Sequence, residues 1–176
     1  MAVAIFERML YNVRNYLQKG VIIMAYSIRQ AKADDSAAVA ALAALLWHSA
    51  TRQELEDEFR EMAGSADTAV FLASEGETVC GFAQCSLRRD YVEGTHSCPV
   101  GYLEGIYVVP EYRNQGCAGA LLAACENWAL DHSCEEFASD CELTNQESLQ
   151  FHLNTGFQEA NRIICFTKKL SILSRR

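Results

Sequence analysis

The segment 113–119, RNQGCAG, carries the clearest chemical signal in this chain. It follows an apolar run that ends at Pro110, and an apolar run typical of a helix comes after it. Gly116 allows a backbone to approach an anion closely, and the N–H groups and dipole of a first helical turn attract that anion. Arg113 adds a positive charge at the start of the segment. The pattern predicts a phosphate-binding turn between a strand and a helix, with an ordinary glycine-containing turn as the alternative.

Two common phosphate-binding loops are excluded by the residues around Gly116. No Gly-Lys-Ser/Thr follows it, as a Walker A loop requires, and the G-x-G-x-x-G spacing of dinucleotide-binding folds is absent. The segment instead resembles the pyrophosphate-binding motif R/Q-x-x-G-x-G/A of the GNAT superfamily of N-acetyltransferases. Arg113, Gly116 and Ala118 fill its three defining positions. In that superfamily the motif follows an apolar strand that ends in V-x-P, and IYVVPEYR stands in this place.

This resemblance implies both a fold and a co-substrate. The expected fold is α/β, the GNAT acyl-CoA N-acyltransferase fold with a central mixed β-sheet flanked by helices. The expected co-substrate is acetyl-CoA, with no metal. Backbone N–H groups at 106–108 would then lie along the thioester and stabilise the oxyanion. The implied cofactor-binding residues are Ile106, Tyr107, Val108, Arg113, Asn114, Gln115, Gly116, Cys117, Ala118, Gly119 and Asn145.

A second signature of the superfamily lies nearer the C-terminus. This signature is an Asn followed by an aromatic residue and a terminal G-F. It is similar to Asn145, Phe151 and the pair Gly156-Phe157 of this chain. His152 stands where many GNAT proteins have a Tyr that protonates the departing CoA thiolate. An imidazolium can donate that proton as well. We therefore interpret His152 as a candidate catalytic acid, with a histidine satisfied between sheet and helix as the alternative.

Within the superfamily, residues 26–170 resemble the aminoglycoside 6'-N-acetyltransferases. The resemblance is carried by the helix end at Trp47 and by the segments DYVEGT, CPVGYLEGIYVVPEYR, EEFASD and HLNTGFQEANRIICFTKK. It implies an antibiotic-resistance enzyme and a homodimer. Our hypothesis for the reaction is direct transfer of the acetyl group in a ternary complex. The acceptor pocket implied by matching positions is lined by Trp47, Tyr91, Glu104 and Asp140.

The residue types at these positions suit an amine acceptor. An amine arrives protonated and must lose a proton before it attacks a thioester, so a carboxylate is needed directly or through water. Glu104 lies inside the apolar run YLEGIYV, where a charge needs a reason, and we interpret it as this base. Asp140 ends the strand FASD, at the edge where α/β ligand sites gather. Trp47 and Tyr91 offer a flat wall and a hydroxyl. The alternatives are an outward-facing Glu104, a solvated Asp140 and a core Trp47.

One departure from the aminoglycoside subgroup bears on the acceptor. An acidic residue is expected at the position of Asn161, and its absence removes one anchor for a polycation. Two other functions therefore stay open. One is acetylation of a different small cationic amine, such as a polyamine or another drug, or of a protein amine. The other is a non-catalytic module that binds CoA or cations.

The remaining pattern predicts the elements that must hold these residues. Alternating apolar residues indicate strands, while helical spacing and N-cap residues indicate helices, with a capping-box pattern at Thr51 and Glu54. One domain is expected over 24–170, after an N-terminal extension at 1–23 with the spacing of a short helix and before a tail at 171–176. The predicted strands are 26–30, 69–73, 78–87, 100–109, 137–141 and 163–169, and the predicted helices are 34–46, 51–62, 116–130 and 145–154.

Composition narrows the partners and the compartment. The net charge of -8 disfavours duplex nucleic acid and is compatible with a cationic substrate. The 8 cysteines lie mostly in apolar runs without a C-x-x-C pair, which favours reduced, buried thiols, and no Cys or His pair has zinc-site spacing. No stretch is long enough to cross a membrane, and no signal-peptide pattern is present. The expected location is cytoplasmic, with no nucleic-acid or membrane partner.

Overall fold

The computed structural model describes residues 26–169. The predicted extension at 1–23 and the predicted tail at 171–176 lie outside these residues. The chain divides into two compact units between Asp140 and Cys141, and each unit is described by itself.

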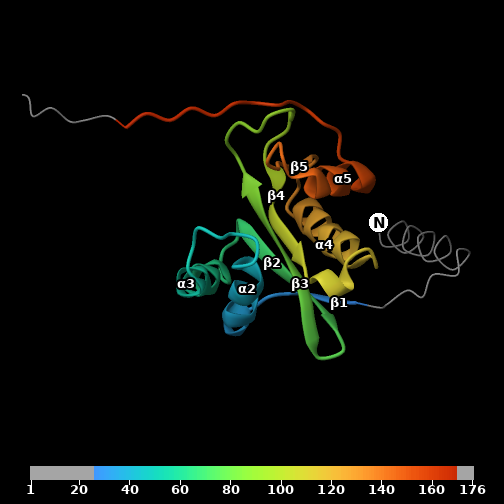
Figure 1. Ribbon diagram of the computed structural model, residues 1–176. Coiled ribbons are helices and arrows are strands. Elements are labelled where there is room, and N and C mark those ends of the chain that lie inside the picture. The colour runs from blue at the N-terminus through green and yellow to red at the C-terminus, as the bar shows by residue number, and fades with distance from the viewer. Residues whose placement is uncertain (1–25, 170–176) are drawn as a thin grey trace, which may run out of the picture. The chain divides into compact units, whose positions relative to one another are not determined.

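The first unit is built on a five-stranded mixed sheet with the order β1-β2-β3-β4-β5 (Figure 1). Strands β1 to β4 are antiparallel to their neighbours, whereas β5 runs parallel to β4. The predicted mixed sheet is thus confirmed. The strands are β1 (Ser27–Gln30), β2 (Thr68–Glu75), β3 (Thr78–Arg88), β4 (Val100–Val108) and β5 (Phe137–Ser139).

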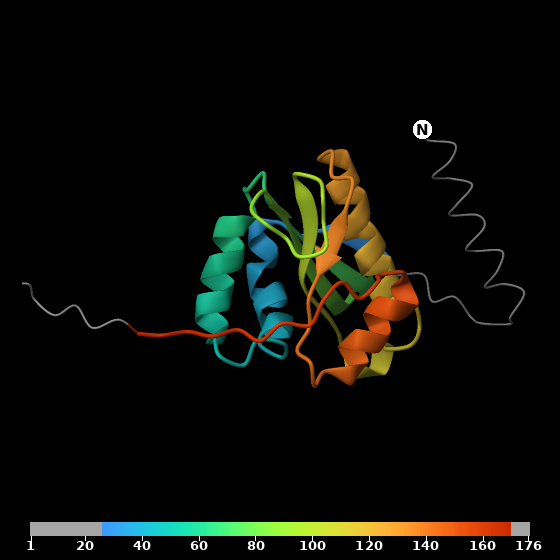
Figure 2. The same cartoon turned by 90° about the horizontal axis from the view of Figure 1, so that it is seen from above.

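Helices cover both faces of this sheet. Figure 2 shows α2 and α3 on one face and α4 on the other. The core on the first side combines α2 and α3 with β2 and β3, and fully buried Phe82 and Leu72 lie at its centre. The helices and short 3-10 turns of this unit are η1 (Ala33–Asp35), α2 (Ser36–Ala43), α3 (Arg52–Met62), η2 (Pro110–Tyr112) and α4 (Cys117–Asp131).

The helix predicted to continue to Leu46 ends earlier, at Ala43. The N–H groups of Leu45 and Leu46 bond the carbonyls three residues back, at Leu42 and Ala43. Such bonds tighten the chain into a 3-10 turn, so the regular helix stops. This turn places Trp47 against the sheet.

The predicted capping box opens α3. Glu54 N–H donates to Thr51 Oγ1 at 3.3 Å, and Thr51 N–H donates to Glu54 Oε2 at 2.8 Å. Replacing Thr51 with Ala should lower the free energy of unfolding by about 1 kcal/mol in a urea titration, because one helix N–H loses its partner. The control Gln53→Ala removes an exposed bond to Asp57 in the same helix and should change stability by less than about 0.5 kcal/mol. Equal losses for the two variants would contradict the capping role.

The second unit contains one helix, α5 (Gln146–Thr155). Asn145 caps it by accepting from Ser148 N–H at 3.0 Å, and Gly156 ends it with a φ of 103°, a conformation that favours glycine. The strand predicted at 163–169 is wrong for this structure, since no regular element follows Thr155 in the described residues. A strand needs a partner edge, and the side chains of Ile164 and Phe166 are 80% and 89% exposed.

Candidate active site

The turn predicted to bind phosphate forms at the start of α4. Gly116 is the helix N-cap with a φ of 89°, and no side chain caps the helix. A Cβ placed on Gly116 or Gly119 would meet no protein atom within 4 Å, so both backbones lie open. The first N–H groups of a helix have no partner within the helix and point outward along its axis. The turn can therefore accept an anion on its backbone, as the sequence predicts.

The polar side chains of the turn bind the protein itself. Arg113 Nε donates to Val108 O at 2.9 Å, and its guanidinium lies 5.5 Å from the centroid of the Tyr107 ring. Gln115 Nε2 donates to Glu111 O at 2.7 Å. These contacts hold the turn against the end of β4. A role of Arg113 toward phosphate stays a prediction.

Cys117, the first residue of α4, is unsuited to nucleophilic chemistry. It is buried with its Sγ 3.9 Å from Cys80 Sγ. Burial, followed by the neighbouring Cys80, raises the pKa of the Cys117 thiol to about 12. The thiolate is the reactive form of cysteine, so Cys117 stays inert near neutral pH.

Glu104 lies at a β-bulge in the middle of β4. Gln84 of β3 pairs with Gly105, while the next residue, Cys85, pairs with Leu103, so Glu104 is an extra residue without a partner in that ladder. On the other side, the pairing of β4 with β5 ends at Leu103. Bulges redirect a side chain and interrupt pairing. From Glu104 onward, β4 is therefore no longer paired with β5.

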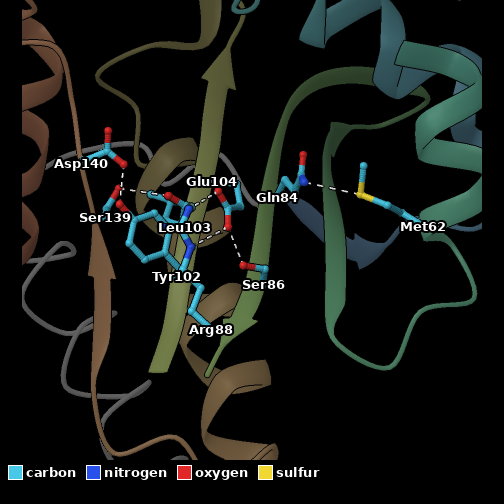
Figure 3. A network of polar contacts seen from close by, with 9 residues as sticks. All are labelled: Met62, Gln84, Ser86, Arg88, Tyr102, Leu103, Glu104, Ser139 and Asp140. Atoms are coloured by element: carbon cyan, nitrogen blue, oxygen red, sulfur yellow. Dashed lines mark hydrogen bonds and ion pairs between the residues drawn. The ribbon is translucent and has the colours of Figure 1, made fainter. Parts of the chain in front are cut away.

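Two residues of β3 bind the Glu104 carboxylate (Figure 3). Ser86 Oγ donates to Oε1 at 2.5 Å. Arg88 donates from Nη2 to Oε2 at 2.7 Å and from Nε to Oε1 at 3.2 Å. Ser86 and Arg88 are two positions apart and so share one face of the strand. Glu104 is thus a hydrogen-bonded carboxylate in an ion pair.

Tyr102 connects this ion pair to Asp140. The Arg88 guanidinium carbon lies 3.3 Å from the centroid of the Tyr102 ring, and the Tyr102 hydroxyl donates to Asp140 Oδ1. Burial, followed by the hydrogen bond to Asp140, raises the pKa of Tyr102. The structure therefore joins the two carboxylates predicted for the acceptor, Glu104 and Asp140, through Arg88 and Tyr102.

Trp47 packs beside the bulge and also in the core. A Cβ on Gly105 would lie 2.6 Å from Trp47 Cζ2, so only glycine lets the indole lie against β4 at this point. The indole also contacts Phe59 and Phe82, with ring centroids 6.3 and 5.8 Å away. Trp47 is half-buried, so one ring serves both as core and as a wall near Glu104.

Tyr91 is not brought into this network. Its side chain is 83% exposed, and its hydroxyl donates to Glu93 at 2.7 Å. The later part of its loop is held by Glu136, which accepts bonds from the N–H groups of His96 and Ser97. The predicted contact of Tyr91 with an acceptor stays a prediction.

His152 and Asn145 lie in the second unit. His152 Nδ1 is 2.7 Å from Ser148 O, which places a proton on Nδ1 because a carbonyl only accepts. Its Nε2 is buried and has no partner among the described residues. The ring lies between Phe151 and Phe157. An imidazole held in this way can carry a proton on Nε2 when charged, while the predicted roles of His152 and Asn145 stay untested.

An open depression of about 430 Å³ adjoins Glu104 in the first unit. Its lining includes Glu58 and Glu61 from α3 together with Gln84 and Ser86 from β3. Three carboxylates and several neutral polar groups therefore face one hollow. Such a lining favours a cationic guest with hydroxyl groups.

Comparison with known proteins agrees with the family resemblance of the sequence. A model of the acetyltransferase (GNAT) family matches residues 39–157. The chain belongs to this GNAT family. An aminoglycoside N(6')-acetyltransferase type 1 from Stenotrophomonas maltophilia is 43% identical over 152 residues, which cover 85% of this chain and 97% of that protein.

Solved structures extend the likeness to the fold of this GNAT protein. A structure of AAC(6')-Iy with the bisubstrate analogue CoA-S-monomethyl-acetylneamine matches with a TM-score of 0.79 and 34% identity, covering 83% of this chain and 99% of that one. The aminoglycoside 6'-N-acetyltransferase AAC(6')-Ih from Acinetobacter baumannii matches with a TM-score of 0.77 and 36% identity, covering 84% and 100%. The expected GNAT fold is therefore confirmed.

Sequence reasoning missed three members of the Glu104 network, namely Ser86, Arg88 and Tyr102. The period-2 alternation of β3 places Ser86 and Arg88 on one face, and this signal was available. The alternation does not identify Glu104 as their partner, because the register between β3 and β4 shifts at the bulge. No group of three or more potential metal ligands occurs within 26–169, and no helix in that range has the length and apolarity to span a membrane.

Proposed function

We propose that this GNAT protein transfers an acetyl group from acetyl-CoA to the 6'-amine of an aminoglycoside, by direct attack in a ternary complex. The observation that carries this proposal is Glu104, a carboxylate redirected by a bulge toward an acidic, polar hollow. A polycationic amino sugar matches such a hollow in charge and hydrogen bonding. Relatives named aminoglycoside N(6')-acetyltransferase, which this chain covers almost end to end, support the same acceptor.

The turn at Gly116 fits the pyrophosphate of acetyl-CoA. Its backbone is open, its helix has no side-chain cap, and the dipole of α4 favours negative charge. When bound, acetyl-CoA supplies an activated acyl group as a thioester. The N–H groups at 106–108, on the part of β4 beyond its pairing with β5, would stabilise developing negative charge on that acyl oxygen.

The remaining roles follow from the acceptor. Glu104 accepts the proton of the incoming ammonium, directly or through water. Asp140 and Tyr91 orient the sugar, and Trp47 supplies an apolar wall near the bulge. His152 donates a proton to the departing CoA thiolate, which leaves as the thiol. These roles are proposals for each named residue.

A screen of amines tests the acceptor. Thiol release from acetyl-CoA is followed with tobramycin, kanamycin, spermidine and a lysine-containing peptide. We expect release with the two aminoglycosides above all others. Release with spermidine or the peptide alone would overturn the aminoglycoside assignment, and this outcome is the one that Asn161, in place of an acid, favours. No release with any amine would support a module that only binds CoA or cations.

We also propose a homodimer in the cytoplasm. The exposed apolar side chains at Ile163, Ile164 and Phe166 support a partner for this segment, because a strand-like stretch gains stability by pairing with another edge. All 8 cysteines are free, which suits a reducing compartment. Light scattering should give twice the mass of the chain, and a monomer at micromolar concentration would contradict the dimer.

A further inference from the structure

The Arg88 guanidinium occupies a place that suits an ammonium ion. It forms two hydrogen bonds with the Glu104 carboxylate and lies 3.3 Å from the centroid of the Tyr102 ring, whose hydroxyl binds Asp140. A carboxylate and the face of an aromatic ring are the groups with which proteins hold organic cations. The protein therefore places its own cation against Glu104 and over the ring whose hydroxyl binds Asp140.

Both oxygens of Glu104 are engaged in this arrangement. Oε1 accepts from Ser86 and from Arg88 Nε, and Oε2 accepts from Arg88 Nη2. An incoming ammonium that approached this carboxylate would meet a positive charge already there. The attraction between Glu104 and the acceptor is then largely cancelled, because like charges at short range repel.

Arg88 is placed so that it can leave. It is the last residue of β3, and its side chain is 40% exposed, against 26% for Glu104. Partly exposed ion pairs contribute little net free energy, so the pair can exchange for a better one. Rotation of the side chain into solvent frees Glu104 and the face of Tyr102 while leaving the backbone pairing of Arg88 with Val100 intact.

We infer that Arg88 is a specificity-determining residue of the acceptor site, an inference that rests on the proposed function of Glu104. In the free protein its guanidinium holds the position of the acceptor ammonium, and an acceptor binds only by displacing it. Acceptors with several ammonium groups can do so, since their other charges interact with the acidic hollow. Simple monoamines cannot, so Arg88 selects for polycations.

Arg88→Gln tests this inference in a binding measurement without turnover. Calorimetry with tobramycin in the presence of CoA, which carries no acetyl group, gives the Kd. We expect the Kd to fall about fivefold, the effect of one partly exposed ion pair. The dependence of the Kd on salt should become steeper, because the site gains one net negative charge. The CoA affinity should not change.

Three further variants make the outcome specific. Arg88→Lys keeps the positive charge but forms fewer hydrogen bonds to Glu104, so its Kd for tobramycin should lie between those of the wild type and of Arg88→Gln. Arg89→Gln, which removes the neighbouring arginine paired with Asp67 at 2.8 Å, should also leave the Kd unchanged. Arg88→Met keeps an apolar stem over Tyr102 and replaces Arg88→Gln if that variant fails to fold. Melting curves establish which variants are folded.

The outcomes separate this inference from the proposed function. Tobramycin binding that is tighter in a neutral variant than in both the wild type and Arg88→Lys supports displacement. A wild type that acetylates tobramycin, with equal or weaker binding in the neutral variants, overturns the inference alone. If the neutral variants also have a lower kcat than the wild type, Arg88 only positions Glu104. Failure of both the wild type and the neutral variants to bind tobramycin would overturn the inference together with the proposed acceptor.

Discussion

Glu104→Gln should reduce kcat for tobramycin by about 10²- to 10⁴-fold, the usual contribution of a general base. The amide has the shape of the carboxylate but cannot take the proton from the acceptor ammonium. The Glu104 side chain binds Ser86 and Arg88 of β3, whereas the proposed pyrophosphate site is the backbone of the Gly116 turn, so CoA affinity should stay unchanged. Steady-state thiol release and CoA calorimetry measure the two quantities.

A surface glutamate provides the control for this experiment. Glu77 lies in the β2–β3 turn beside Gly76 and is exposed, so Glu77→Gln should retain the wild-type rate. A second check is the melting temperature, because Glu104→Gln leaves Arg88 with a weaker partner. A folded Glu104→Gln protein with a kcat within twofold of the wild-type value would contradict the general-base role of Glu104.

Gly116→Ala should weaken CoA binding by about tenfold or more, equivalent to about 1.4 kcal/mol. Two causes act together. The φ of 89° at Gly116 is a conformation that costs about 1–2 kcal/mol for a residue with a Cβ. The Cβ would also stand in the open space that the turn presents to an anion, since no protein atom fills it. Calorimetry with CoA measures the loss.

Gly64→Ala is the matched control for Gly116. A Cβ at Gly64 also meets no atom within 4 Å, and its φ lies outside the left-handed region. The substitution should leave CoA affinity unchanged and alter stability by no more than about 1 kcal/mol. A Gly116→Ala variant that is less stable but binds CoA as tightly as the wild type would contradict this site, because the pyrophosphate would then bind elsewhere.

Local signals explain what could be predicted. The N-cap at Gly116 and the capping box at Thr51 each depend on residues within a few positions of one another. Glycine at a positive φ and side chains that bind nearby N–H groups act over that range. The element order and most boundaries therefore follow from the sequence, and the family motif predicts that α4 presents its N-terminus to an anion.

The acceptor side required long-range information. Glu104 is recognisable as an unusual charge in an apolar run, but its partners Ser86 and Arg88 are 18 and 16 residues away. Which of the β3 side chains reaches Glu104 depends on the register shift between β3 and β4. A bulge of one residue changes the face and the neighbours of every side chain beyond it.

The sequence by itself predicted the fold class through its resemblance to the GNAT superfamily. Residue types and local spacing, together with that resemblance, marked the turn at Gly116 and the candidate carboxylates Glu104 and Asp140. Only the tertiary structure decided that Arg88 and Tyr102 join those carboxylates, and that the Tyr91 hydroxyl donates to Glu93. It also decided that residues 163–169 form no strand within the described chain. The physical reason is the same in each case. Pairing between strands and between charges is set by which segments meet in space, and local propensity does not specify the partner.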